Sequence, residues 1–193
     1  MRGFPNMLVM APADENECRQ MLQTAYEYPG PAMVRYPRGR GSGVEVDPAS
    51  KVLTLGQAEV RREGRRVAFL VFGNLCAIAD QVAEELDASL VNMRFIKPLD
   101  ESQVLVMAER HELLVTLEEN SLQGGAGSAV NEYLMQVGNP VRVLNLGLPD
   151  RFIEHATQQE QLSAAGLDVV AITAKVQRVL QQSPISVVAG ATN

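Results

Sequence analysis

The sequence contains 193 residues, which is enough for one complete α/β domain and part of a second. Hydrophobic residues account for 46% of it, so the chain can form a sizeable core, and disorder is excluded as its main state. The formal net charge of -6 argues against a nucleic-acid-binding domain, because such domains usually carry an excess of Lys and Arg.

The two cysteines, Cys18 and Cys76, lie far apart in periodic segments, and we expect both to be small buried hydrophobic residues in a reducing compartment. Together with only two histidines, they do not indicate a redox or metal site. No run of 18 apolar residues predicts a membrane span, and the first ten residues lack the features of a signal peptide. We therefore expect a cytoplasmic protein that binds neither membranes nor nucleic acid.

The first 38 residues predict a strand, a helix and a second strand. Apolar runs at 7–11 and 32–36 indicate the strands. Asp14, with Glu17 three positions later as in a capping box, begins a helix that a Pro-Gly-Pro segment ends. This unit has the size of a βαβ crossover, but two strands and one helix cannot bury their own faces. Residues 1–38 are therefore predicted to be the end of a larger domain whose earlier part lies outside this chain.

Residues 39–54 are Gly-rich and polar and predict a linker, whereas residues 55–182 predict a complete domain and residues 183–193 a mobile tail. Within the domain, strands alternate with helices. The expected strands are 55–61, 66–72, 88–93, 113–117 and 141–146. The expected helices cover about 75–86, 100–110 and 125–137, and two more begin after Thr157 and Asp168, of which Thr157 has a capping-box Glu160.

This alternation predicts a three-layer α/β/α domain with a mostly parallel five-stranded sheet. The first two strands of the domain are expected to form a hairpin around residues 62–65, which makes one strand antiparallel. The segment VAFLVF at 67–72 is continuously apolar, as in a strand that is covered on both faces.

Two arginines lie at the end of the strand at 32–36 and just beyond it, in the segment Arg35-Tyr-Pro-Arg38. Ligands of open α/β sheets bind near the carboxyl ends of parallel strands, and a guanidinium suits phosphate because its planar donors can bond two oxygens. Pro37 limits Tyr36 to extended conformations, which would aim Arg38 reproducibly. The alternative is a solvated basic loop that leads into the linker, and Arg40 fits that description best.

The segment EENSLQGGAGS at 118–128 joins a strand to a helix through a glycine-rich loop. A helix N-terminus of this kind could bind an anion, but Glu118 and Glu119 place negative charge at its mouth. The loop contains neither a Walker motif nor GxGxxG. Close packing that the glycines permit is the favoured interpretation.

Other polar segments have structural interpretations that we favour. RFIKPLD at 94–100 places two cations at a strand end, but it also fits a loop that ends in a helix cap. His111 and His155 are expected to be structural or solvated, and the run RREGRR at 61–66 is expected to be a solvated hairpin tip. No catalytic constellation is complete, because the sequence shows no nucleophile–His–acid set, no cluster of metal ligands and no GDG diphosphate motif.

Several long motifs nevertheless resemble one enzyme family. Their order and spacing across nearly the whole chain resemble the C-terminal third of the 1-deoxy-D-xylulose-5-phosphate synthases and, more loosely, the C-terminal domains of transketolase and of the pyruvate dehydrogenase β-subunit. The motifs are ENECRQML at 15–22, VRYPRG at 34–39, MRFIKPLD at 93–100, VTLEEN at 115–120, GGAGSAVNE at 124–132 and LNLGLPDRFI at 144–153.

The resemblance implies a homodimeric transferase that uses thiamine diphosphate and Mg²⁺. Such enzymes decarboxylate pyruvate and join the two-carbon unit to D-glyceraldehyde 3-phosphate, a step that feeds isoprenoid, thiamine and pyridoxal synthesis. In the family order a diphosphate-binding domain comes first, a pyrimidine-binding domain second and the transketolase C-terminal domain third. Residues 1–38 would then be the end of the second domain and residues 55–182 the third.

The resemblance also assigns a role to the arginines. The second arginine of VRYPRG binds the phosphate of glyceraldehyde 3-phosphate in this family, which here is Arg38, and Arg35 ranks below it. No catalytic, cofactor-binding or metal-binding residue carries over, so the chain alone is expected to be inactive. Two alternatives stay open: a stand-alone, non-catalytic α/β binding or dimerisation module, and an autonomous enzyme that uses the loop at 118–128 but for which no nucleophile is found.

Overall fold

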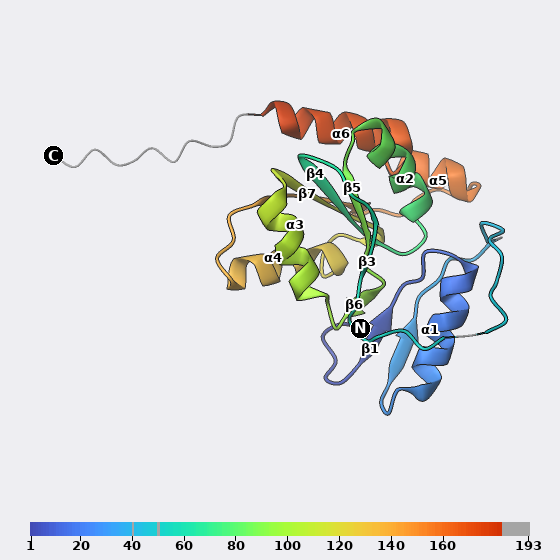
Figure 1. Ribbon diagram of the computed structural model, residues 1–193. Helices are drawn as coiled ribbons and strands as arrows, with labels where there is room; N and C mark the ends of the chain where they lie inside the picture. Colours follow the sequence, from blue (N-terminus) through green and yellow to red (C-terminus); the bar gives the residue numbers. More distant parts are fainter. Residues whose placement is uncertain (40, 50, 183–193) are drawn as a thin grey trace.

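The computed structural model describes residues 1–39, 41–49 and 51–182. A large sheet carries helices on both faces, and a small sheet with one helix lies against one of its ends (Figure 1). The tail predicted at 183–193 and the predicted solvated charge of Arg40 lie outside the described residues.

The described residues form eight strands and six helices. The strands are β1 (Leu8–Met10), β2 (Ala32–Val34), β3 (Glu59–Arg62), β4 (Val67–Phe72), β5 (Ser89–Asn92), β6 (Phe95–Lys97), β7 (Leu113–Ser121) and β8 (Arg142–Leu148). The helices are α1 (Glu15–Glu27), α2 (Cys76–Glu85), α3 (Glu101–Arg110), α4 (Ala126–Gln136), α5 (Gln158–Ala164) and α6 (Val169–Gln181).

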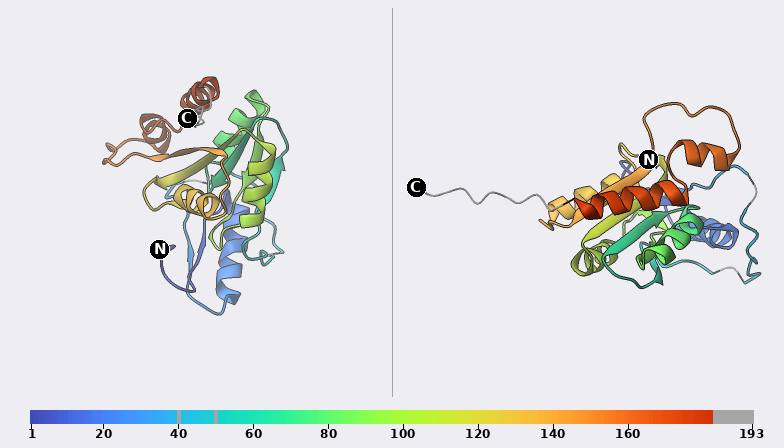
Figure 2. Two further views of the ribbon diagram at one scale, coloured as in Figure 1. Left: turned by 90° about the vertical axis from the view of Figure 1, so that its left-hand side faces the viewer. Right: turned by 90° about the horizontal axis from the view of Figure 1, so that it is seen from above.

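The large sheet has the strand order β3-β5-β4-β7-β8, in which β3 is antiparallel to β5 and the other neighbours are parallel. Helices α2 and α6 cover one face and α3 and α4 the other (Figure 2). Successive residues of β4 point alternately to these two faces, so Phe69 packs under α2 and α6 while Leu70 packs under α3 and α4. The predicted three-layer domain with a mostly parallel five-stranded sheet is confirmed.

The predicted hairpin is wrong, because β3 pairs with β5 and not with β4. Strand β4 has β5 on one edge and β7 on the other, so neither edge is left for β3. Strand β3 therefore pairs with the outer edge of β5, and it begins at Glu59 rather than at residue 55.

The small sheet contains a strand that the sequence did not predict. Strands β1 and β2, which precede and follow α1 in the chain, pair in parallel, as expected. Strand β6 pairs with β1 in the antiparallel direction, which gives the strand order β2-β1-β6. Strand β6 lies within the RFIKPLD segment. Its Phe95 is fully buried with Met10 and Met21 in a core of its own. The third strand of the small sheet thus comes from a segment that lies more than 80 residues after β1 in the chain.

A buried polar network also joins the two sheets. The carboxylate of Glu17 in α1 accepts hydrogen bonds from Asn92 Nδ2 at 2.9 and 3.0 Å and from Arg94 Nε at 2.6 Å. Asp14 caps α1 through the N–H of Glu17, as predicted, but the Glu17 carboxylate accepts the N–H of Ala13 rather than completing the capping box. The charged side chain of Glu17 therefore stabilises the contact between the two sheets.

The described part of the segment predicted as a linker lies along α1. Ser42 and Gly43 donate hydrogen bonds to the Glu15 carboxylate, and the N–H of Leu53 donates to Thr24 Oγ1. The residues described between 39 and 54 contain no helix and no strand. They connect the two sheets over the outer surface of the small one.

Candidate functional site

The two arginines of the predicted phosphate site lie just beyond β2. The N–H of Arg35 donates to the carbonyl of Met10 at 2.9 Å, which continues the pairing of β1 with β2 by one residue. Arg38 follows after Tyr36 and Pro37, and its side chain is exposed. The structure therefore places both arginines at the carboxyl end of a parallel strand, where the sequence predicts them.

The environments of the two side chains differ. Arg35 Nη2 donates to the main-chain carbonyl of Glu119 at 2.5 Å, and its Nη1 lies 3.8 Å from Glu119 Oε2. Arg38 forms no ion pair with any described residue. Glu119 lies near the carboxyl end of β7, so Arg35 connects the small sheet to the large one while Arg38 stays available.

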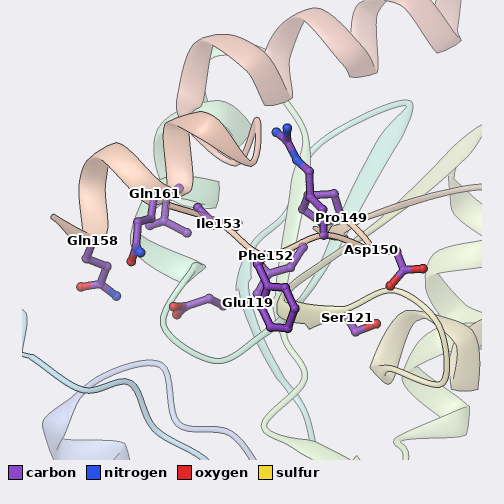
Figure 3. A pocket seen from close by; sticks show the side chains of 11 residues that line it. Glu119, Ser121, Pro149, Asp150, Phe152, Ile153, Gln158 and Gln161 are labelled. Carbon is purple, nitrogen blue, oxygen red and sulfur yellow. The ribbon is translucent and has the colours of Figure 1, made fainter. Parts of the chain in front are cut away.

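A cavity of about 590 Å³ lies beside Glu119, above the carboxyl ends of β7 and β8. The Glu119 side chain projects into the space between Phe152 and the glutamines of α5 (Figure 3). Phe152 is fully exposed, and Glu119 Oε2 is buried without a hydrogen-bond partner among the described residues. The cavity is further lined by Ser121, Leu148, Pro149, Asp150, Arg151, Ile153, Gln158, Gln161 and Leu162.

Sequence reasoning missed this cavity, because its walls come from segments that lie far apart in the chain. The motif LPDRFI, which supplies one wall, was noticed only as part of the family resemblance. Its exposed Phe152 is a signal that the sequence alone could not show.

A second cavity, of about 750 Å³, separates α1 from α2 and from the junction of α5 with α6. Residues on both sides of Arg38 contribute to its wall, among them Pro37 and Gly39, and Gln158 and Leu162 line both cavities. The loop that carries Arg38 thus lies at the junction of the two hollows.

The glycine-rich loop after β7 is filled by the protein itself. The Glu118 carboxylate accepts the N–H groups of Ala126 and Gly127 at 2.8 and 2.9 Å at the start of α4. Burial raises the pKa of the Glu118 carboxyl, against the opposite effect of these two donors. A Cβ on Gly127 would lie 2.4 Å from Thr116 Oγ1, so this glycine is required for close packing. An internal carboxylate occupies the helix N-terminus, which favours the packing interpretation over a phosphate site.

The cations of RFIKPLD are also engaged. Arg94 pairs with Glu17 and with Glu59, and Lys97 Nζ donates to the carbonyls of Arg2 and Phe4. Asp100 caps α3 through the N–H of Gln103. The segment is therefore structural, although it forms a strand and not only a loop.

His111 is buried, with Nε2 2.9 Å from Ser89 Oγ and Nδ1 2.9 Å from the carbonyl of Met107. Its neighbours satisfy both ring nitrogens, which gives it a structural role. His155 is exposed. Cys76 is buried, as expected, and burial raises the pKa of its thiol to about 12, whereas Cys18 is only half-buried.

The arginines of RREGRR are exposed or half-buried, and acidic side chains pair with them. Arg62 and Arg65 lie near Asp87, and Arg66 pairs with Glu112. In the described part of the chain, no three His, Cys, Asp or Glu side chains gather where they could hold a metal ion. None of the described helices is long and apolar enough to cross a membrane.

Comparison with known proteins agrees with the fold. The family model described as "Transketolase, C-terminal domain" matches residues 56–172, so the chain belongs to the transketolase C-terminal domain family. A solved structure described as "Split gene transketolase, inactive beta4 tetramer" is 34% identical, with a TM-score of 0.82 over 93% of this chain and 60% of that one. Transketolase from Campylobacter jejuni, at 19% identity, has the same fold with a TM-score of 0.67 over 92% of this chain and 27% of that one.

Curated relatives are similar over almost the whole chain. The 1-deoxy-D-xylulose-5-phosphate synthase of Hamiltonella defensa is 55% identical over 177 residues, which is 92% of this chain and 28% of that protein. That of Cellvibrio japonicus is 56% identical over 172 residues, which is 89% of this chain and 27% of that protein. The chain therefore spans less than a third of the length of these relatives, and its sequence is similar to 1-deoxy-D-xylulose-5-phosphate synthases.

Proposed function

We propose that this chain is the C-terminal part of a 1-deoxy-D-xylulose-5-phosphate synthase. The whole enzyme condenses pyruvate, with decarboxylation, and D-glyceraldehyde 3-phosphate into 1-deoxy-D-xylulose 5-phosphate for isoprenoid, thiamine and pyridoxal synthesis. It is a cytoplasmic homodimer that uses thiamine diphosphate and Mg²⁺. Residues 1–38 complete its pyrimidine-binding domain, residues 39–54 are a linker, and residues 55–182 are its third domain. The similarity over about nine-tenths of the chain supports this assignment.

The observation that supports phosphate binding by this chain is the position of Arg38. It lies beyond the carboxyl end of β2, on a short loop next to a proline, and its exposed guanidinium has no acidic partner among the described residues. A guanidinium in this setting suits a phosphate, because it offers planar paired donors and a charge that the protein leaves uncompensated. We assign Arg38 as the main ligand of the substrate phosphate; the sequence offered Arg35 as a lower-ranked candidate, and its contact with Glu119 gives it a different environment.

The residues of this chain do not fit the diphosphate of the cofactor. The one glycine-rich helix N-terminus that the sequence suggested holds the Glu118 carboxylate, which would repel a diphosphate. The cofactor is therefore assigned to the rest of the enzyme, and no step of the reaction is assigned to the described residues beyond binding the substrate phosphate.

A chimera provides the test of Arg38. In it, residues 1–193 replace the matching segment of the Cellvibrio japonicus relative. Arg38→Ala should raise the KM for glyceraldehyde 3-phosphate roughly tenfold to a hundredfold, because a charge-assisted hydrogen bond contributes about 1.5–3 kcal/mol. The matched control is Arg65→Ala, since the Arg65 side chain is 88% exposed and lies near Asp87. An unchanged KM in a folded Arg38→Ala chimera would refute the assignment.

A further inference from the structure

We propose that Arg35 is a positioning residue, which anchors the loop of Arg38 to the large sheet through Glu119, and not a second ligand of the phosphate. The proposal rests on the phosphate-binding role of Arg38 given above. It assigns different tasks to two arginines that the sequence presents as a pair, and it gives Glu119 a role as the anchor.

Arg35 is held at both of its ends. Its main-chain N–H donates to Met10 in the small sheet, and its guanidinium donates to the carbonyl of Glu119 in the large sheet. The side chain is 35% exposed and that of Glu119 only 17%. A side chain that bridges two sheets in this way restricts the relative position of the strand ends that it joins.

The charge around Arg35 argues against direct phosphate binding. The Glu119 carboxylate lies 3.8 Å from Arg35 Nη1, and its Oε2 is buried without a hydrogen bond among the described residues. A phosphate that approached Arg35 would meet this carboxylate and compete with it for the same cation. Arg38 has no such neighbour in the part of the chain that the structure describes, so its charge is fully available.

The chain between the two arginines is short and stiff. Only Tyr36 and Pro37 separate them, and the proline ring fixes its own φ angle and limits Tyr36 to extended conformations. If the backbone at Arg35 moves, Arg38 therefore moves with it by a similar distance. An anchored Arg38 binds phosphate more tightly, because less conformational freedom is lost on binding.

A double-mutant cycle in the chimera tests this role. The readout is the ratio of kcat/KM for D-glyceraldehyde 3-phosphate to that for D-glyceraldehyde, which reports on the phosphate alone. We expect Arg35→Ala to lower the ratio about threefold to tenfold when Arg38 is present and to have no further effect in the Arg38→Ala background. Reductions that multiply in the double variant would show that Arg35 binds the phosphate itself, and an unchanged ratio in Arg35→Ala would show that the anchor is not needed. Either result overturns the proposal.

A second experiment uses the 193-residue chain and needs no activity. Trypsin cleavage after Arg38 and amide exchange at position 35, whose N–H is bonded to the Met10 carbonyl, should be about threefold to tenfold faster in Arg35→Ala, because the loop loses its anchor. Arg35→Lys keeps the charge but loses the paired donors. Its rates of cleavage and exchange should lie between those of Arg35→Ala and those of the unmodified chain. The control Arg65→Ala should match the unmodified chain.

The two experiments separate the two proposals. If cleavage and exchange at the loop do not change in Arg35→Ala and Arg35→Lys, the anchoring role is refuted whatever the substrate is. If the loop is loosened but Arg38→Ala leaves the phosphate ratio of the chimera unchanged, the phosphate-binding role fails, and with it the proposed task of the anchor in catalysis.

Discussion

The two sheets of this protein are stabilised in different ways. The large sheet buries both of its faces under four helices, and its central strand β4 is buried at every position. The small sheet has one helix and two strands of its own, and it becomes three-stranded only by pairing β1 with β6. We therefore expect the large sheet to fold as a unit of its own and the small sheet to depend on the large one.

This difference bears directly on the candidate site. Arg38 and Arg35 belong to the small sheet, but Glu119 and both cavities involve the large one. The contacts that hold the sheets together therefore decide where the arginines lie. Substitutions in the large sheet, in the small sheet and at the contact between them should therefore lower the free energy of unfolding by different amounts. They should also loosen different parts of the chain.

The largest effect is expected from matched phenylalanine substitutions. Phe69 and Phe95 are both fully buried, the former in β4 and the latter in β6. Phe69→Ala should cost about 4 kcal/mol of unfolding free energy and Phe95→Ala about 3 kcal/mol, because the smaller core can relax further around the cavity. Chemical denaturation gives these values.

Hydrogen exchange shows the extent of each effect. Phe69→Ala should accelerate exchange throughout the chain, whereas Phe95→Ala should accelerate it mainly at residues 8–34 and leave β4 and β7 protected. Uniform acceleration by both variants would contradict the independence of the large sheet from the small one.

The next effect concerns the network between the sheets. Glu17→Gln keeps the size of the side chain but removes the charge that Arg94 and Asn92 bind, and it should cost about 2 kcal/mol. Glu15→Gln is the matched control, since Glu15 lies on the same helix and, among the described residues, accepts hydrogen bonds from the exposed segment of Ser42 and Gly43. Equal losses in the two variants, measured by urea denaturation, would mean that the buried network does not hold the sheets together.

A smaller effect is expected inside the large sheet, at the loop that Glu118 caps. Gly127→Ala would place a Cβ 2.4 Å from Thr116 Oγ1 and 2.7 Å from Asn145 Nδ2, and it should cost about 1.5 kcal/mol. Gly3→Ala meets no atom within 4 Å and should leave the melting temperature nearly unchanged. Thermal unfolding of the two variants distinguishes a packing glycine from a merely flexible one.

The smallest effect depends on pH. The Ser163 hydroxyl, at 2.6 Å, and the N–H of Ala171, at 2.8 Å, lower the pKa of Asp168 at the start of α6. A lowered carboxyl pKa gives stability that is present above the pKa of the unfolded chain and is lost as pH falls through the folded value.

Asp168→Asn should therefore cost about 0.5 kcal/mol at pH 7 and almost nothing at the lowest pH at which the protein stays folded. Urea denaturation across this pH range measures the difference. A stability gap between the two proteins that did not shrink as pH fell would contradict the assigned cause of the pKa shift.

Local patterns made most of the large sheet predictable. The apolar run of β4 indicated a strand that is covered on both faces, and Thr157 with Glu160 forms the reciprocal capping box that the sequence predicts. Asp100 and Asp168 begin their helices as expected. These signals lie within a few residues of the element that they determine.

Long-range contacts could not be predicted in the same way. Strand β6 has three residues, and its partner β1 lies more than 80 positions earlier. The family resemblance ranks Arg35 below Arg38 as a phosphate ligand, but nothing near Arg35 in the sequence indicates that Glu119 will meet it. The sequence predicted that both arginines lie at the carboxyl end of a strand, as the structure shows, whereas the contact of Arg35 with Glu119 could not be predicted.

We have proposed that this chain supplies phosphate recognition to an enzyme whose cofactor site lies elsewhere. The most direct test of this proposal compares the 193-residue chain with the folded chimera for formation of 1-deoxy-D-xylulose 5-phosphate, with pyruvate, glyceraldehyde 3-phosphate, thiamine diphosphate and Mg²⁺ present. We expect product from the chimera and none from the chain alone. Turnover by the chain alone, or a correctly assembled chimera that forms no product, would contradict the proposal, and the latter would favour a non-catalytic binding or dimerisation module.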